Sequence, residues 1–311
     1  MTGYEALRES AAWLDLSDRG EIRVGGEDRA RLLHAMCTNH IHELRFGDGQ
    51  YAFFLNAQGR ILGDAYVYDL GETLLLDTEP EAAKKIREHL DKYIIADDVT
   101  LEDETHQWTT IGLEGPESAA AAAKLNIAIP DRKYCLRNWD NGFVARVAST
   151  GPKGFRIFVP TDEKAHLVAR LEKAGISNAT AAEARVVRLE NGIPRYGEDV
   201  TERYLVQETQ MLHGVHPNKG CYLGQEIVER VRSRAQVHRV LAPIRIRGTE
   251  VPQPGTKLTT EGKDVAEITS AAYSPALGEV VGLAYVRTEA AHKKPEMAVA
   301  GREPLLSAYI A

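Results

Sequence analysis

Several chemically distinctive side chains gather in one short stretch, KGCYLGQEIVERVRSR, at residues 219–234. It contains Cys221, one of three cysteines in the chain, between two glycines that favour a loop. Apolar residues at helical spacing follow, so we expect this loop to lead into a short helix. A helix N-terminus and the nearby ammonium of Lys219 would both stabilise a thiolate. Cys221 is therefore a candidate reactive thiol, although most free cysteines are small buried hydrophobic residues.

The same stretch is locally basic within an acidic protein. Against only two glutamates, it combines Lys219 with arginines that continue a little beyond it: Arg230, Arg232, Arg234 and Arg239. A solvated helix face is the ordinary interpretation of such a run. Guanidinium groups can also donate paired hydrogen bonds to a carboxylate or a phosphate, so an anion-binding surface is the alternative.

Two carboxylates stand in unusual places. Asp64 interrupts the apolar segment ILGDAYV, in the second strand of a hairpin that we expect at residues 51–56 and 61–68. A buried carboxylate is costly unless it is paired, hydrogen-bonded or functional; alternatively, the side chain points outward from the strand. Glu190 lies where a helix that starts with a T-x-x-E capping box should end. The residues alone favour a solvated acid at that position, because a carboxylate is slightly unfavourable at a helix C-terminus.

The octet K-G-C-Y-x-G-Q-E at residues 219–226 resembles the signature of the YgfZ group of folate-binding proteins, which in turn resembles the glycine-cleavage T protein. Further matches run from Asp18 to about Arg239, and they include R-x-E-x-G at 188–192 followed by Y-G-x-D at 196–199. The resemblance implies a multi-lobed folate-binding fold and a tetrahydrofolate-type ligand. Because the group is linked to iron-sulfur cluster assembly or repair, it also implies protein partners from that process.

The resemblance implies roles for individual residues as well. Glu190 would accept hydrogen bonds from the 2-amino group and N3–H of the pterin, which are two parallel donors. Tyr196 and Glu208 would line the same region. The glutamyl tail of the folate would be bound by basic residues of the stretch described above: Lys219, Arg230 and Arg232.

The resemblance also implies a role for Asp64. In T proteins, a Gly-Gly-x-x-Asp-Asp segment places a carboxylate beside the reactive nitrogens of folate. Asp64 matches the second aspartate of that segment. The first aspartate is replaced by Gly63, and the double glycine is replaced by Gln58 and Gly59. This departure speaks against aminomethyl transfer.

Three functions of different classes therefore remain open. The first is a folate-binding accessory factor for iron-sulfur proteins that uses Cys221, and the second is a folate-dependent aminomethyl transferase that uses Asp64. The third is a protein linked to transfer-RNA modification that uses the arginines. The first agrees best with the cysteine signature and with the missing aspartate, and we expect nucleic acid not to be the main ligand.

Composition narrows these possibilities. The net charge of −7 argues against a surface made for nonspecific binding of nucleic acid or anionic membranes. The three cysteines lack CxxC spacing, and His40 and His42 lack a third ligand, so we expect no metal site. The chain has no apolar targeting segment and no run of about eighteen apolar residues. We therefore expect a cytoplasmic protein without membrane association.

Strands and helices must position these residues. Strand patterns outnumber helical ones but mix with them without regular βα alternation, which indicates an α+β fold with largely antiparallel sheets. Residues 1–240 would form two intertwined lobes that bind folate. Residues 241–311 contain short apolar stretches broken by glycine and proline, which indicate a small antiparallel β-barrel.

Overall fold

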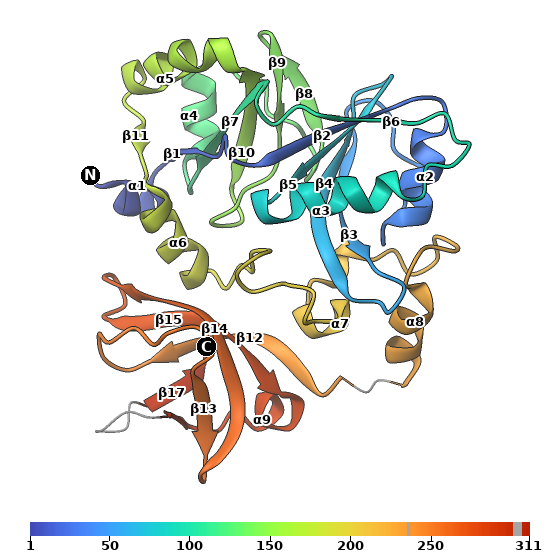
Figure 1. Ribbon diagram of the computed structural model, residues 1–311. Coiled ribbons are helices and arrows are strands. Elements are labelled where there is room, and N and C mark those ends of the chain that lie inside the picture. Colours follow the sequence, from blue (N-terminus) through green and yellow to red (C-terminus); the bar gives the residue numbers. More distant parts are fainter. Residues whose placement is uncertain (235–236, 301–306) are drawn as a thin grey trace.

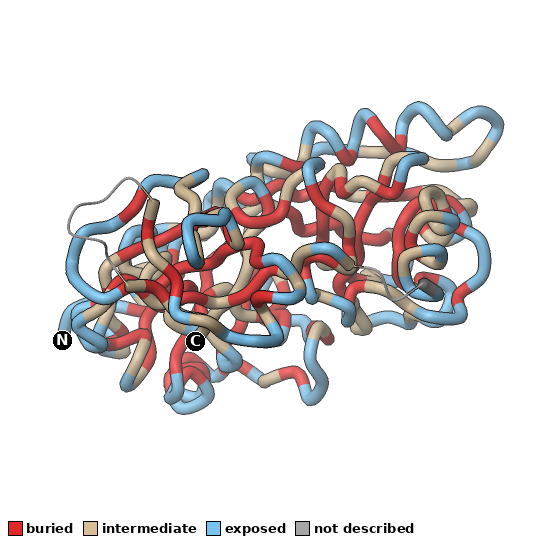
Figure 2. Tube along the Cα trace, turned by 90° about the horizontal axis from the view of Figure 1, so that it is seen from below, coloured by how far each residue is buried: buried red, intermediate tan, exposed pale blue. Residues whose placement is uncertain are grey.

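The computed structural model describes residues 1–234, 237–300 and 307–311, except for the side chain of Arg234. A six-stranded sheet, a five-stranded sheet and a closed barrel form three bodies with helices around them (Figure 1). Each of the three bodies has its own core of buried apolar residues, and buried residues are red in Figure 2. The predicted α+β fold with largely antiparallel sheets and a C-terminal β-barrel is confirmed.

The six-stranded sheet combines the N-terminal strand with strands from the middle of the chain. In spatial order it contains β11 (Ser177–Asn178), β1 (Ala12–Asp15), β7 (Trp108–Glu114), β10 (Gly154–Pro160), β9 (Gly142–Ala145) and β8 (Leu136–Trp139). The helices that share its core are α4 (Ser118–Lys124) and α5 (Lys164–Lys173), with a short 3-10 turn, η1 (Thr161–Glu163), before α5. Ala121 and Ala122 of α4 are buried in that core, so the run of alanines lets this helix pack closely on the sheet.

The five-stranded sheet is built on the predicted hairpin. In spatial order it contains β3 (Gly49–Leu55), β4 (Ile61–Asp69), β5 (Leu74–Thr78), β2 (Gly20–Gly25) and β6 (Thr100–Asp103). Two helices pack on it through buried residues such as Leu33 and Ile86: α2 (Arg29–Met36) and α3 (Pro80–Asp91). Asp64 therefore lies on β4, next to the centre of this sheet.

The closed barrel is formed by the C-terminal strands. In spatial order these are β12 (Arg239–Ile246), β15 (Glu279–Arg287), β14 (Lys263–Ser274), β13 (Lys257–Thr260), β16 (Met297–Val299) and β17 (Ser307–Ile310). Helix α9 (Thr288–Lys293) follows β15 and packs against β12 and β15. The predicted domain boundary between residues 240 and 241 falls inside β12.

Helix α6 (Ala181–Glu190) lies between the six-stranded sheet and the barrel (Figure 1). Its predicted capping box is present, because the Thr180 side chain accepts the Glu183 backbone N–H and the Glu183 side chain accepts that of Thr180. After the helix, the buried carboxylate of Asp199 accepts hydrogen bonds from Arg188 at 2.7 Å and from Thr269 of the barrel at 2.6 Å. One carboxylate thus joins α6 to the barrel.

Helix α1 (Gly3–Glu9), which was not expected from the sequence, packs against α6. A capping box of Thr2 and Glu5 starts this helix and is readable as T-x-x-E in the sequence. The remaining short elements are α7 (Val206–Thr209), η2 (Leu212–Gly214) and α8 (Gln225–Arg234). Of the helices in the described residues, none combines the length and the apolar composition that crossing a membrane requires.

A buried ion network joins the two sheets. Asp77, on β5, accepts a hydrogen bond from Arg19 Nε at 2.5 Å and another from Arg156 on β10. Asp77 is fully buried, and the two arginines are only 4% and 1% exposed. Such charges remain ionised inside a protein only when they are paired. This contact therefore fixes the position of one sheet against the other.

Candidate functional site

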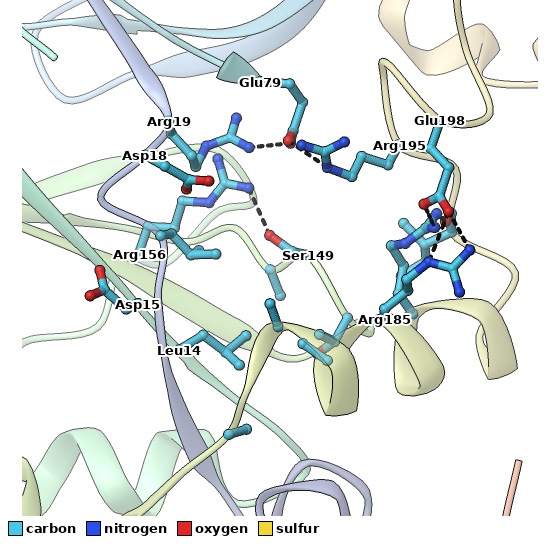
Figure 3. Close-up of a pocket in the computed structure, with 18 of the residues that line it drawn as sticks. Leu14, Asp15, Asp18, Arg19, Glu79, Ser149, Arg156, Arg185, Arg195 and Glu198 are labelled. Carbon is cyan, nitrogen blue, oxygen red and sulfur yellow. Dashed lines mark hydrogen bonds and ion pairs between the residues drawn. The ribbon is translucent and has the colours of Figure 1, made fainter. Parts of the chain in front are cut away.

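A cavity of about 440 Å³ lies where the two sheets meet α6 (Figure 3). Its apolar lining comes mainly from small or aliphatic residues, namely Leu14, Leu16, Ala148, Ala179, Ala181, Ala184, Ile193 and Pro194. Its charged lining consists of Asp15, Asp18, Arg19, Glu79, Arg156, Arg185, Arg188, Arg195 and Glu198. The size and the combination of apolar wall with converging polar groups are typical of a small-molecule site.

Ion pairs order the charged wall before any ligand binds. Glu79 lies between Arg19 and Arg195, whose Nε is 2.8 Å from a Glu79 oxygen (Figure 3). Burial alone would raise the pKa of Glu79, but these arginines hold it below its ordinary value. Glu198 is bound in the same way by Arg185 and Arg188. Each of the five guanidinium groups is paired with a carboxylate, among them Asp77 and Asp199 behind the wall, so the wall is a preformed array of hydrogen-bond donors and acceptors.

Asp64 lies beside this cavity rather than in its lining. It shares a face of β4 with Tyr66, which does line the cavity, because side chains two residues apart in a strand point the same way. Its Oδ2 accepts a hydrogen bond from the Tyr51 hydroxyl at 2.6 Å, and its side chain is buried. The alternative of an outward-facing strand residue is therefore wrong.

Burial raises the pKa of Asp64 to about 7, although the hydrogen bond from Tyr51 and the charge of Arg19 oppose that rise. A carboxyl group with this pKa exchanges its proton near neutral pH. That is the property expected of a general acid or base.

Two family models match almost the whole chain. The GCVT N-terminal domain matches residues 2–219, and the glycine cleavage T-protein C-terminal barrel domain matches residues 239–309. The chain belongs to the glycine cleavage T-protein family. The match places the sheets, α6 and the cavity in the first domain and the barrel in the second.

Relatives of known name agree with this family. An aminomethyltransferase of Rubrobacter xylanophilus is 30% identical over 294 residues, covering 92% of this chain and 78% of the relative. An aminomethyltransferase of Streptomyces avermitilis is 31% identical over 310 residues, covering 95% and 83%. A putative chloroplastic transferase of Arabidopsis thaliana is 26% identical, covering 92% and 68%.

The fold of the family is also found in a solved structure. The glycine cleavage system aminomethyltransferase T from Bartonella henselae superimposes with a TM-score of 0.90 at 20% sequence identity, covering 99% of this chain and 87% of that one. At this identity the likeness concerns the fold alone.

Gly63 stands where T proteins of the family are expected to carry the first aspartate, and the structure explains the glycine. A Cβ atom at this position would lie 2.9 Å from Ala82 and 2.8 Å from Ile86, both on α3. Residue 63 therefore faces α3, on the opposite side of β4 from Asp64. The missing aspartate removes no carboxylate from the side of the strand on which Asp64 lies.

Glu190, expected from the resemblance to hold the pterin, does not line the cavity. Arg188 and Glu190 are two residues apart on α6 and hence about 200° apart around the helix, so they face opposite ways. The carboxylate of Glu190 accepts hydrogen bonds from Tyr4 at 2.5 Å and Ser274 at 2.6 Å, and it pairs with Arg8 at 2.9 Å. It lines a second pocket on the other side of α6.

Tyr196 and Glu208 also lie outside the cavity lining. Tyr196 is buried, and its hydroxyl donates to the carbonyl of Leu62, two residues before Asp64. Glu208 accepts hydrogen bonds from the Leu205 backbone N–H at 2.8 Å and from Arg239 Nε at 2.7 Å. Both side chains thus have protein partners that connect neighbouring segments.

The basic residues expected to bind the glutamyl tail do not form one surface. Lys219 is buried, and its ammonium donates to the carbonyls of His34 and Cys37 at the end of α2, the latter at 2.5 Å. Arg232 pairs with Glu229 at 2.6 Å, and Arg230 is exposed on α8. None of the three lines the cavity, and the side chain of Arg234 lies outside the described residues.

The cavity arginines were not among the site residues expected from the sequence. Arg188, Arg195 and Glu198 stand within or beside R-x-E-x-G and Y-G-x-D, so the motifs did mark their neighbourhood. Arg19 and Arg156 are far apart in the sequence and carry no local signal. Only the pairing of the two sheets brings them together.

The histidines expected as a pair belong to a larger group. The ring of His34 stacks on His42 at 4.2 Å between centroids and contacts His40 edge-on at 4.6 Å. His216 lies 5.3 Å from His40. Across the described residues, no three His, Cys, Asp or Glu side chains are arranged to hold a metal ion.

Cys221 is exposed, whereas Cys37 and Cys135 are buried. The expected helix begins only at Gln225, four residues after the cysteine, and the ammonium of Lys219 contacts α2 instead. Exposure, and not the dipole or the lysine, is therefore the structural reason to expect reactivity.

We expect Cys221 to be alkylated by iodoacetamide near pH 7.5 at least tenfold faster than Cys37 or Cys135 in the folded protein. Burial raises the pKa of both other thiols and hides them from the reagent. Peptide mass spectrometry over time measures the three rates, with Cys221→Ser as the control. Equal labelling of Cys37 in the folded protein would contradict this expectation.

Proposed function

We propose that this protein binds a reduced folate in the cavity beside α6 and catalyses a folate-dependent one-carbon transfer of the aminomethyltransferase type. The observation that carries the proposal is Asp64, a buried carboxyl group beside the cavity with a pKa of about 7. The names of the relatives support transfer better than an accessory role. The position of Gly63 against α3 removes the main objection from the sequence.

In this proposal the residues have separate tasks. The apolar wall receives the ring system, and guanidinium groups of the charged wall offer hydrogen-bond donors to the carboxylates of folate. Tyr51 holds the carboxyl group of Asp64 in position through its hydrogen bond. When a folate nitrogen attacks the one-carbon unit, the bond between that carbon and its donor breaks and the donor leaves with the bonding electrons. Ionised Asp64 accepts the proton that the folate nitrogen releases.

Calorimetric titration with a reduced folate tests binding, and a single-turnover assay with a glycine-derived aminomethyl donor tests transfer. We expect Asp64→Asn to lower the transfer rate by about 100-fold or more while the dissociation constant changes less than about threefold. A group that acts on the developing charge contributes chiefly to the transition state. The exposed Asp131→Asn is the matched control. Absence of folate binding by the wild-type protein would overturn the proposal.

A second candidate function is the YgfZ-type accessory role in iron-sulfur cluster assembly or repair. The exposed thiol of Cys221, within the K-G-C-Y-x-G-Q-E segment, favours it. Folate binding without any one-carbon transfer in the assay above would support this candidate. The transfer-RNA hypothesis receives less support from the structure, because two of its basic residues, Lys219 and Arg239, are engaged by protein groups while Arg230 remains exposed.

A further inference from the structure

The two arginines that α6 contributes to the cavity, Arg185 and Arg188, are held partly from behind the cavity wall. Both pair with Glu198, and Arg188 also donates to the buried carboxylate of Asp199 at 2.7 Å. Arg185 donates to the backbone carbonyl of Ala271, on strand β14 of the barrel, at 2.7 Å. Neither Asp199 nor Ala271 lines the cavity, so groups outside it help to set the direction of both side chains.

The barrel also fixes Asp199, through two neighbouring hydroxyl groups of β14. Thr269 and Ser270 both donate to Oδ1 of Asp199, at 2.6 Å and 2.5 Å, while its Oδ2 accepts the hydrogen bond from Arg188. Asp199, Thr269 and Ser270 are all buried. Because both carboxylate oxygens have buried donors, the barrel determines where Arg188 finds its acceptor.

A β-bulge in β14 makes this double contact possible. Side chains next to each other in a regular strand point to opposite faces of the sheet. The pairing of β14 with β15 shifts by one residue between Ile268 and Ser270, so Thr269 is the extra residue of a bulge. The bulge allows the hydroxyls of Thr269 and Ser270 to reach the same carboxylate oxygen. Re-aiming side chains in this way is a common use of bulges beside functional sites.

We propose that residues 269–271 of the barrel are positioning residues for the cavity, because they fix Arg185 and Arg188 in the direction in which these arginines receive the ligand. This inference rests on the proposed function, which identifies the ligand as a reduced folate. In the part of the chain that the structure describes, no residue after Glu198 lines the cavity. The barrel thus controls the affinity for the ligand from behind the wall.

The first test needs no ligand. Phenylglyoxal modifies arginine side chains, and it reacts slowly with a guanidinium group that is buried and hydrogen-bonded. In the double variant Thr269→Val with Ser270→Ala, we expect Arg188 to be modified about fivefold faster than in wild type, because fewer hydrogen bonds oppose local opening. Peptide mass spectrometry over time measures the rate. Arg156, which is buried and paired with Asp77, is the internal reference and should react at the wild-type rate.

The second test uses tetrahydrofolate. We expect calorimetric titration to show about tenfold weaker binding by the double variant, since a misplaced binding group loses much of its effect. The single-turnover transfer rate at saturating folate should stay within about twofold of wild type, because Asp64 is not held by the barrel. A general loss of structure would lower both quantities. Thr269→Ser keeps the hydroxyl and should bind like wild type, whereas Thr269→Val should not.

The matched control is Thr259→Val on β13, which removes a hydroxyl that donates to the Ala298 carbonyl within the barrel at 3.4 Å. It should change neither the labelling nor the affinity. If the double variant is unfolded, Thr269→Val takes its place in both tests.

The outcomes separate this inference from the proposed function. If the double variant keeps the wild-type labelling of Arg188, or loses no more affinity than the control, the positioning role is wrong while the proposed function stands. If wild type binds no tetrahydrofolate, the proposed function fails. Faster labelling of Arg188 in the variant would then still support the positioning of the arginines by the barrel, and unchanged labelling would overturn it.

Discussion

Asp77→Asn is expected to lower the free energy of unfolding by about 3–5 kcal/mol, the range found when one partner of a buried ion pair is removed. Asp77 is fully buried and is the carboxylate shared by Arg19 and Arg156. Asparagine keeps the size of the side chain but removes its charge. The two arginines would then face each other across the sheets with less compensation.

Chemical denaturation of wild type and variant at pH 7 measures this loss. Asp131→Asn is the control, because it breaks a pair with Arg137 at 2.5 Å in which the two side chains are 81% and 48% exposed. Exposed pairs contribute about 0–1 kcal/mol, so the control should stay close to wild type. A loss below about 1 kcal/mol for Asp77→Asn would show that the network does not hold the sheets together.

The stability of the wild type relative to Asp64→Asn should fall by about 3 kcal/mol between pH 5 and pH 8. The pKa of Asp64 is raised by burial to about 7, whereas an unfolded aspartate has a pKa near 3.9. Between these values the native state keeps a proton that the unfolded state releases. Each increase of one pH unit therefore lowers the free energy of unfolding of the wild type by about 1.4 kcal/mol, until the native group ionises as well.

Denaturation curves of both proteins at pH 5, 6, 7 and 8 provide the measurement. Asparagine carries no titrating group, so subtracting its curve removes the pH dependence of the other residues. The free energy of unfolding of the wild type minus that of Asp64→Asn should fall steadily up to about pH 7 and level off above it. A difference that does not change with pH would mean that Asp64 is ionised throughout, and its role as a proton acceptor near neutral pH would lose its basis.

Local patterns in the sequence were enough to predict the hairpin that carries Asp64, the capping box at Thr180 and the antiparallel barrel. The hairpin and the capping box depend on interactions between residues close together in the chain, such as turn residues and side-chain caps. The strands of the barrel carry a similar local signal, although the barrel closes through pairs distant in sequence, such as β12 with β17. The costly position of Asp64 could be predicted for the same reason, since its neighbours on both sides are apolar.

The lining of the cavity was decided by the tertiary structure. Arg19, Arg156 and Arg188 come from a turn, a strand and a helix that meet only because the two sheets and α6 pack together. Motifs also mark a segment without showing where each side chain points. The orientation of α6 turned Arg188 toward the cavity and Glu190 toward the second pocket, and the packing of Lys219 on α2 removed it from the surface. Side-chain direction depends on long-range packing, which no local sequence pattern contains.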